Sequence, residues 1–223
     1  MNKTDTFVHF LVESGALKFG DFVTKSGRKT PYFINTGEFR TGASLSKLAE
    51  FYAAAFMEHF DGKAENLYGP AYKGIPLCAA TAMKLSDVYA KNLTFTYNRK
   101  EVKDHGEGGS LVGYKYSEKT NVVIIEDVIT AGTSVNETMQ ALSQMENVKV
   151  VGLLISVDRR ERLENGKSAL QDVQDNYGLE ARSIISIDDI IKFLESEENR
   201  KAINAPEGIL DRVYAYREQW GVK

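Results

Sequence analysis

Short apolar segments alternate with helical segments through most of this sequence, from about residue 43 onward. The apolar segments are rich in β-branched residues, whereas the segments between them repeat apolar residues three and four positions apart. Strands that alternate with helices pair in parallel through right-handed crossovers. We therefore predict an α/β fold with a parallel sheet of about five strands flanked by helices. The predicted strands are 66–70, 93–98, 121–127, 148–158 and 182–187, and the helices between them are 43–60, 75–90, 134–145 and 168–178.

The first forty residues follow a different pattern. A helix is predicted over 5–14, ended by Gly15, and two strands follow around a turn at 25–28. We predict that residues 1–40 form a small helix-and-hairpin hood on an α/β core of residues 41–223, within a single domain. Two terminal helices are predicted at 188–196 and 209–220.

Composition excludes several classes of function. The formal net charge of -3 argues against a general nucleic-acid binder, which would carry an excess of basic residues. The single cysteine, Cys78, cannot form an intrachain disulfide and indicates a reducing compartment. The three histidines are scattered, so no zinc-type cluster is expected, and no apolar run reaches membrane-spanning length. We expect a cytoplasmic protein with neither nucleic-acid nor membrane partners.

The most informative segment joins a predicted strand to a predicted helix. The strand ends in adjacent carboxylates, Glu126 and Asp127, and the small and hydroxyl residues from Thr130 to Ser134 open the helix. Small residues let backbone N–H groups approach a phosphate closely, and a helix N-terminus favours negative charge. A phosphate would repel the carboxylates, so they suit bonds to sugar hydroxyls or a metal. The segment predicts a ribose 5-phosphate site, with an ordinary helix N-cap at Thr133 or Ser134 as the alternative.

A second segment, RKEVKDHGEGG, begins at Arg99 and combines cations with glycines. Arg99, Lys100, Lys103 and His105 can donate hydrogen bonds to an anion, and the glycines lower strand and helix propensity. In an extended segment, Lys100 would face away from the other three. We predict that residues 100–110 form a cationic lid, disordered without ligand, that closes over an anionic substrate. A solvated surface loop is the alternative.

Several of these segments resemble those of known enzymes. VVIIEDVITAGTS resembles the 5-phosphoribosyl 1-diphosphate (PRPP) signature of the type I phosphoribosyltransferases. RKEVKDHGEGG, GPAYKGIP, KSGRKTPYFIN and SVDRRER resemble segments of the orotate phosphoribosyltransferase family, and the similarity runs from about Leu17 to the C-terminal helices. The resemblance implies a type I phosphoribosyltransferase fold. It also implies transfer of ribose 5-phosphate from PRPP to orotate, giving orotidine 5′-monophosphate and diphosphate in pyrimidine (UMP) synthesis.

The resemblance also implies roles for individual residues. Catalytic roles fall on Lys73, Lys103, His105 and Asp127. PRPP contacts fall on Lys25, Tyr72, Lys73, Arg99, Lys100, Lys103, His105, Glu126, Asp127, Val128, Ile129, Thr130, Ala131, Gly132, Thr133 and Ser134. Orotate contacts fall on Phe33, Ile34, Thr130 and Arg159. Many family members have Asp at the position of Glu126 and Phe at that of Ile34; the first change keeps the carboxylate, and the second contact is largely made by backbone.

The leaving group explains the many cations. At an effective dielectric of ~20, a cation about 4 Å from an anion contributes roughly 4 kcal/mol before desolvation, so a diphosphate needs several cations and Mg²⁺. The resemblance implies Mg²⁺ held mainly by the diphosphate, near Glu126 and Asp127, without a direct protein ligand. His105 is either a proton donor to the leaving group or a hydrogen-bond donor to it. The family's lid reaches into the neighbouring subunit, which implies a homodimer with shared active sites.

Two alternatives remain at this point. A purine-type phosphoribosyltransferase would share the signature segment, but the guanidinium of Arg159 and the hairpin around Phe33 favour a carboxylated pyrimidine. A non-catalytic nucleotide-sensing regulator on the same fold would lack the cationic loop and would carry a basic face or an added DNA-binding domain.

Overall fold

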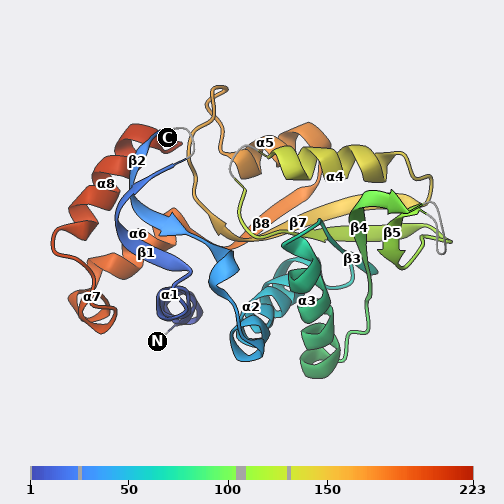
Figure 1. Cartoon of the computed structure of the whole chain (residues 1–223), viewed down its shortest axis with the longest axis horizontal. Coiled ribbons are helices and arrows are strands. Elements are labelled where there is room, and N and C mark those ends of the chain that lie inside the picture. The colour runs from blue at the N-terminus through green and yellow to red at the C-terminus, as the bar shows by residue number, and fades with distance from the viewer. Residues whose placement is uncertain (1, 25–26, 104–108, 130–131, 223) are drawn as a thin grey trace.

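The computed structural model describes residues 2–24, 27–103, 109–129 and 132–222, with backbone alone for 100–103 and 109. A six-stranded sheet of order β5-β4-β3-β6-β7-β8 runs through its centre (Figure 1). Five neighbouring strands pair in parallel, and β5 is antiparallel to β4 at one edge. The predicted parallel sheet of about five strands is therefore confirmed. The strands are β3 (Asn66–Gly69), β4 (Thr94–Lys103), β5 (Gly109–Gly113), β6 (Thr120–Ile125), β7 (Val148–Asp158) and β8 (Glu180–Ser186).

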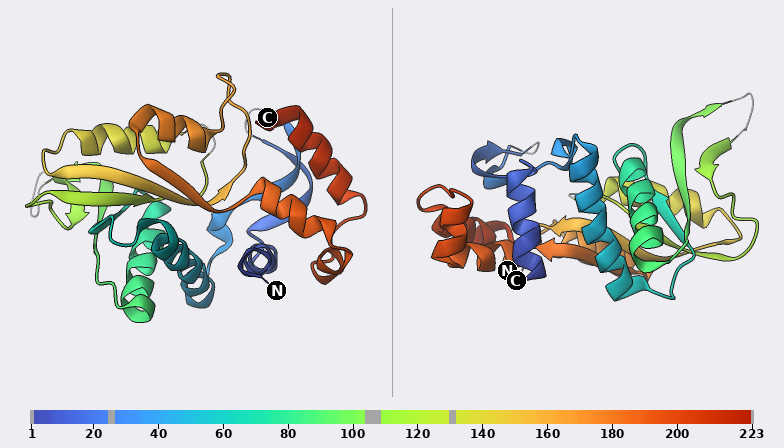
Figure 2. Two further views of the ribbon diagram at one scale, coloured as in Figure 1. Left: turned by 180° about the vertical axis from the view of Figure 1, so that it is seen from behind. Right: turned by 90° about the horizontal axis from the view of Figure 1, so that it is seen from below.

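Helices cover both faces of this sheet (Figures 1 and 2). One face carries α2 (Gly42–Phe60) and α3 (Gly74–Tyr89), and the other carries α4 (Thr133–Ser143) and α5 (Ala169–Tyr177). Strand β6 shows why its sequence is apolar at each of the last four positions. Val123 and Ile125 join the core beneath α2 and α3, whereas Val122 and Ile124 join the core beneath α4 and α5. Both faces of a parallel sheet are buried, so side chains that point to either face must be hydrophobic.

Strand β5 was not predicted. It begins and ends with glycine, which has poor strand propensity, but it pairs with β4 from Thr96↔Gly113 to Lys103↔Gly109. Pairing with β4 therefore overrides local preference at this edge. The prediction that the whole segment 100–110 lacks regular structure is wrong at both ends, where the backbone belongs to β4 and β5. Residues 104–108 lie outside the described part, and closure on ligand stays a prediction.

The hood lies beyond the carboxyl ends of the parallel strands, together with the C-terminal helices (Figure 1). Helix α1 packs against α6 and β8, and α8 packs against β2 of the antiparallel hairpin β1–β2. The division at residue 40 stays a prediction, although two helices from the other end of the chain, α6 and α8, pack against the hood. Its elements are α1 (Lys3–Glu13), β1 (Leu17–Val23), β2 (Lys29–Ile34) and the 3₁₀ turn η1 (Thr36–Glu38), and the C-terminal helices are α6 (Ile187–Glu195), α7 (Glu197–Ala202) and α8 (Ile209–Trp220).

No helix in the described ranges combines the length and the hydrophobicity needed to cross a bilayer.

Candidate active site at the carboxyl edge of the sheet

The chain after β6 is held by neighbouring elements on two sides. The backbone oxygen of Asp127 accepts hydrogen bonds from Ser156 of β7, from its N at 2.8 Å and its Oγ at 2.7 Å. The backbone oxygen of Glu126 accepts one from the buried hydroxyl of Tyr52 on α2 at 2.7 Å. The backbone that carries the two carboxylates is therefore held in place by hydrogen bonds from β7 and α2.

The carboxylate of Asp127 joins three parts of the chain. Its Oδ2 accepts a hydrogen bond from Thr36 Oγ1 of η1 at 2.7 Å and another from Lys73 Nζ at the start of α3 at 3.1 Å. Thr36 is buried and the Lys73 side chain is 54% exposed, so one donor is enclosed and the other is accessible to a ligand. Sequence reasoning missed Thr36, because nothing local marks a threonine 91 positions from its acceptor.

The carboxylate of Glu126 has different surroundings. It is buried, its Oε2 accepts from Ser134 Oγ at 3.0 Å, and its Oε1 accepts from the backbone N of Asp127 at 3.1 Å. Burial, followed by the negative charge of Asp127, raises the pKa of Glu126 to about 7. The adjacent acids are thus an enclosed carboxyl that titrates near neutral pH and a carboxylate paired with a lysine.

Helix α4 begins at Thr133, six residues after Asp127 in the sequence. Its N-cap is Gly132, in the left-handed conformation at φ +72°, and no side chain caps the helix. The alternative of Thr133 or Ser134 as an ordinary N-cap is therefore wrong; Ser134 instead donates to Glu126. Uncapped N–H groups at a helix N-terminus suit an anion. In the preceding loop, Val128 is half-buried and Ile129 is buried in the core beneath α4 and α5.

Two glycines bring the start of α3 against β3 and β6. A Cβ atom on Gly69 would lie 2.3 Å from the backbone oxygen of Gly74, and one on Gly74 would lie 3.0 Å from that of Ile125. The turn between them contains a cis peptide bond from Ala71 to Tyr72, and the backbone N of Ala71 donates to Asn98 Oδ1 of β4 at 2.8 Å. This close packing places Lys73 beside the carboxyl end of β6.

The family model for the phosphoribosyl transferase domain matches residues 37–191. Over 217 residues, the chain is 49% identical to the orotate phosphoribosyltransferase of Lachnoclostridium phytofermentans, an alignment that covers 97% of this chain and 96% of the relative. The corresponding protein of Clostridium acetobutylicum is 46% identical over 217 residues, with 97% of both chains covered. The chain belongs to the orotate phosphoribosyltransferase family.

The solved structure of the Francisella tularensis orotate phosphoribosyltransferase has the same fold, with a TM-score of 0.83 at 34% identity, covering 97% of this chain and 99% of that one. The resemblance inferred from the motifs, and the type I phosphoribosyltransferase fold that it implied, are thereby confirmed.

Several residues that the family resemblance assigned to PRPP lie together at the carboxyl edge. Tyr72 and Lys73 occupy the turn before α3, and the Tyr72 side chain is 68% exposed. Arg99 follows Asn98 on β4 and is half-buried. Other assigned residues lie outside the described part, either entirely or in their side chains: Lys25, Lys100, Lys103, His105, Thr130 and Ala131.

The residues that the family resemblance assigned to orotate are brought together only in part. Arg159 directly follows β7, is buried, and holds its guanidinium carbon 4.9 Å from the ring centre of Tyr32 on β2. Ile34 is half-buried on the same face of β2 as Tyr32, but Phe33 faces the other way, is 42% exposed and stacks on Phe22 at 5.5 Å. The structure therefore joins Arg159 to the hairpin through Tyr32 rather than through the Phe33 side chain.

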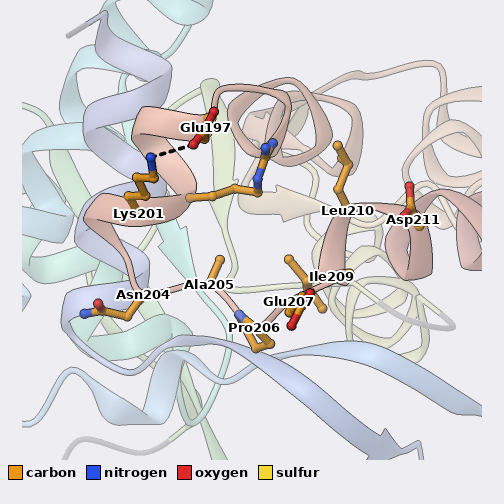
Figure 3. A pocket seen from close by; sticks show the side chains of 11 residues that line it. Glu197, Lys201, Asn204, Ala205, Pro206, Glu207, Ile209, Leu210 and Asp211 are labelled. Atoms are coloured by element: carbon orange, nitrogen blue, oxygen red, sulfur yellow. Dashed lines mark ion pairs between the residues drawn. The ribbon is translucent and has the colours of Figure 1, made fainter.

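A surface pocket of about 770 Å³ lies at α7 and α8, away from these residues (Figure 3). Three of its charged side chains are engaged locally: Lys201 Nζ lies 2.5 Å from Glu197 Oε1, and Arg200 donates to the backbone oxygens of Leu194 and Glu195. None of the described site residues lines this pocket.

Proposed function

We propose that this chain transfers ribose 5-phosphate from PRPP to orotate, releasing orotidine 5′-monophosphate and diphosphate, as a step of pyrimidine (UMP) biosynthesis. The observation that carries the proposal is the convergence on Asp127 Oδ2 of Thr36 from the hood and Lys73 from α3, directly ahead of the uncapped helix α4. Sugar hydroxyls, a phosphate and a leaving anion each have a suitable partner within this one arrangement.

The 5-phosphate would bind at the N-terminus of α4. Gly132, Thr133 and Ser134 offer backbone N–H groups there, and the exposed threonine and serine add hydroxyl donors. Residues Val128 to Ala131 would complete this proposed phosphate site, and of these Thr130 and Ala131 lie outside the described part. Glu126 and Asp127 would then accept hydrogen bonds from the ribose hydroxyls. A carboxylate close to a phosphate is repelled by it but can bind neutral hydroxyl donors.

The diphosphate would leave toward the cations. The bond from ribose C1 to diphosphate oxygen breaks as N1 of orotate bonds to C1. The departing electron pair stays on the diphosphate, which also takes up the proton lost from N1. Lys73 is the described cation best placed to exchange Asp127 for that anion, and Asp127 would stabilise positive charge on the ribose. Further contacts to the diphosphate are proposed for Lys25, Tyr72, Arg99, Lys100, Lys103 and His105.

The residues present suit Mg²⁺ that is supplied with the substrate. Among the described residues, no group of three or more His, Cys, Asp or Glu side chains could form a metal cage. The diphosphate would hold Mg²⁺ through the hard oxygen donors that this ion prefers, with the carboxylates of Glu126 and Asp127 nearby but not as direct ligands. When bound, Mg²⁺ neutralises charge on the leaving group. Chelation should abolish turnover, and added Mg²⁺ should restore it.

Arg159 favours orotate over a purine as acceptor, because a planar guanidinium matches a carboxylate and purine bases have none. The decisive experiment supplies magnesium PRPP with orotate, uracil, hypoxanthine or adenine and measures diphosphate release. Turnover with orotate alone supports the proposal. Turnover with a purine would establish the purine-type alternative, whereas PRPP binding without turnover on any base would support the regulator.

A homodimer with shared active sites and a cytoplasmic location belong to the same proposal. Mixing Lys103→Ala subunits with Asp127→Asn subunits tests the sharing. If each site combines these residues from different subunits, random reassortment should restore about a quarter of wild-type activity. A mixture as inactive as its components, with exchange verified by mass, would refute shared sites.

A further inference from the structure

Glu161 accepts hydrogen bonds from a neighbouring arginine and from side chains in two distant parts of the chain. Its Oε1 accepts from Arg159 Nε at 2.8 Å, from Arg159 Nη2, and from the hydroxyls of Tyr216 at 2.8 Å and Tyr32 at 3.5 Å. Its Oε2 accepts from Arg28 Nη1 at 3.1 Å. We call these five residues the Glu161 cluster. It joins the hood hairpin, the segment after β7 and helix α8.

The way Arg159 is held determines what it can offer a ligand. A guanidinium presents two paired edges, Nε with Nη2 and Nη1 with Nη2. Glu161 takes the first edge of Arg159. The second edge, made by Nη1 and the remaining N–H of Nη2, has the parallel geometry that binds a carboxylate in a bidentate manner. One carboxylate thus orients the guanidinium for another.

The position of Glu161 is itself tightly determined. On either side of it, the backbone N of Arg162 donates to Trp220 O at 2.8 Å, and the backbone N of Val222 donates to Arg160 O at 2.9 Å. The ring of Tyr32 packs edge-on against that of Tyr216 with centres 5.6 Å apart. Burial raises the pKa of both tyrosines, so both phenols stay protonated donors. Glu161 therefore has little freedom to follow Arg159 if the guanidinium moves.

The charges in the cluster also suit one more anion. Arg28 and Arg159 are cations and Glu161 is an anion, so two positive charges and one negative charge leave a single positive charge. The carboxylate of orotate would complete this balance. Because the Arg159 side chain is only 10% exposed, an unpaired guanidinium would be costly to keep there, and Glu161 supplies the permanent counterion.

We infer that Glu161 is a positioning residue for orotate: it holds the Nε–Nη2 edge of Arg159 so that the other edge binds the orotate carboxylate. The inference rests on the proposed function, since it assigns Arg159 to orotate. It goes beyond that proposal in tying selectivity for the carboxylated base to helix α8 and the hood hairpin through Tyr216, Tyr32 and Arg28. Glu161 itself does not contact the substrate in this arrangement.

The test is a pair of substitutions with the two Michaelis constants measured separately. Glu161→Gln keeps the size of the side chain and removes its charge. We expect the KM for orotate to rise about tenfold, while kcat at saturating orotate and the KM for PRPP stay within about twofold. Glu161→Asp keeps the charge and should recover most of the loss. Tyr216→Phe, which removes one donor to Glu161, should raise the KM for orotate about threefold.

Glu180→Gln is the matched control, because Glu180 likewise pairs with two cations, Arg182 and Lys63, but at the start of β8. Wild-type KM values for both substrates are expected there. An orotate KM unchanged or lowered in Glu161→Gln would overturn the inference, as would equal rises in both KM values. If Glu161→Gln is too unstable to assay, Tyr216→Phe takes its place. A rise in the KM for orotate without a rise in the KM for PRPP would then support the inference, and any other result would overturn it. Failure of the wild-type protein to use orotate would instead refute the proposed function.

Discussion

Lys73 Nζ lies 3.1 Å from Asp127 Oδ2, although the two residues are 54 positions apart. The lysine is the N-cap of α3 and the aspartate follows β6, so the contact joins two neighbouring βα units at the carboxyl edge. More than half of the Lys73 side chain is exposed, and an ion pair of this kind contributes only about 0–1 kcal/mol to stability. We therefore expect Lys73 to matter for catalysis and not for stability. In the reaction its ammonium group would leave the Asp127 carboxylate and bind the departing diphosphate.

Lys73→Met should lower kcat/KM for PRPP by about 100-fold, because a charge-assisted contact to the leaving group is lost. The melting temperature should change by no more than about 2 °C. Lys84→Met is the control, since Lys84 also lies on α3 and pairs with a glutamate, Glu50, away from the carboxyl edge. Equal activities of the two variants would exclude the proposed role of Lys73.

Thr36→Val should lower kcat/KM for PRPP by about tenfold, since Asp127 loses the enclosed hydrogen bond that fixes its carboxylate. Thr36→Ser retains the hydroxyl and should remain within about twofold of wild type. Steady-state kinetics on both variants provide the check. If valine and serine behaved alike, the hydroxyl of Thr36 would have no part in positioning Asp127.

Arg159→Lys should raise the KM for orotate about 30-fold and leave the KM for PRPP within about twofold, because lysine keeps the charge but cannot bind a carboxylate in a bidentate manner. Arg182→Lys, in an exposed pair on β8, serves as the control. Steady-state kinetics with orotate varied at saturating magnesium PRPP measure the change directly. Unaltered orotate affinity in Arg159→Lys would show that another group binds the carboxylate.

Glu126 makes the stability of the folded protein depend on pH. Burial and the charge of Asp127 raise its pKa from 4.5 to about 7, so below that value the folded state holds a proton that the unfolded chain releases above about 4.5. Stability should therefore fall as pH rises through this window and level off above it. Glu126→Gln lacks this titration, so relative to wild type it should gain on the order of 2 kcal/mol between about pH 5 and about pH 8.

Urea unfolding at several pH values measures this difference. Glu218→Gln, at an exposed position on α8, should show the wild-type dependence. Parallel stability curves for wild type and Glu126→Gln would mean that Glu126 is ionised throughout the window.

Gly69→Ala should destabilise the protein by about 3 kcal/mol or prevent folding, because the new Cβ would lie 2.3 Å from the backbone oxygen of Gly74 and 2.6 Å from Cys78 Cβ. Gly42→Ala is the control: it lies in the first turn of α2, and no atom lies within 4 Å of its added Cβ. Urea unfolding should leave the stability of that control within about 0.5 kcal/mol of wild type. Similar midpoints for both variants would show that α3 can move away from β3.

The positions of the parallel strands and of most helices could be predicted because each depends on its own residues. The last four residues of strand β6, from Val122 to Ile125, are all apolar because both faces of the strand are covered, and the acids and glycine after it mark a βα turn. Strand β5 and helix α7 were missed for the converse reason. The first is flanked by glycines and depends on β4, and the second has only six residues, too few for a periodic signal.

The sequence alone determined the α/β architecture, the acid pair, and the small residues that open α4, since these follow from local composition and order. Only the tertiary structure decided which groups meet: Thr36 with Asp127 across 91 positions, and Arg28 with Glu161 across 133. Residues so far apart carry no local sign of one another. Their contact depends on the path of the folded chain, which returns the hood and the C-terminal helices to the carboxyl edge of the sheet.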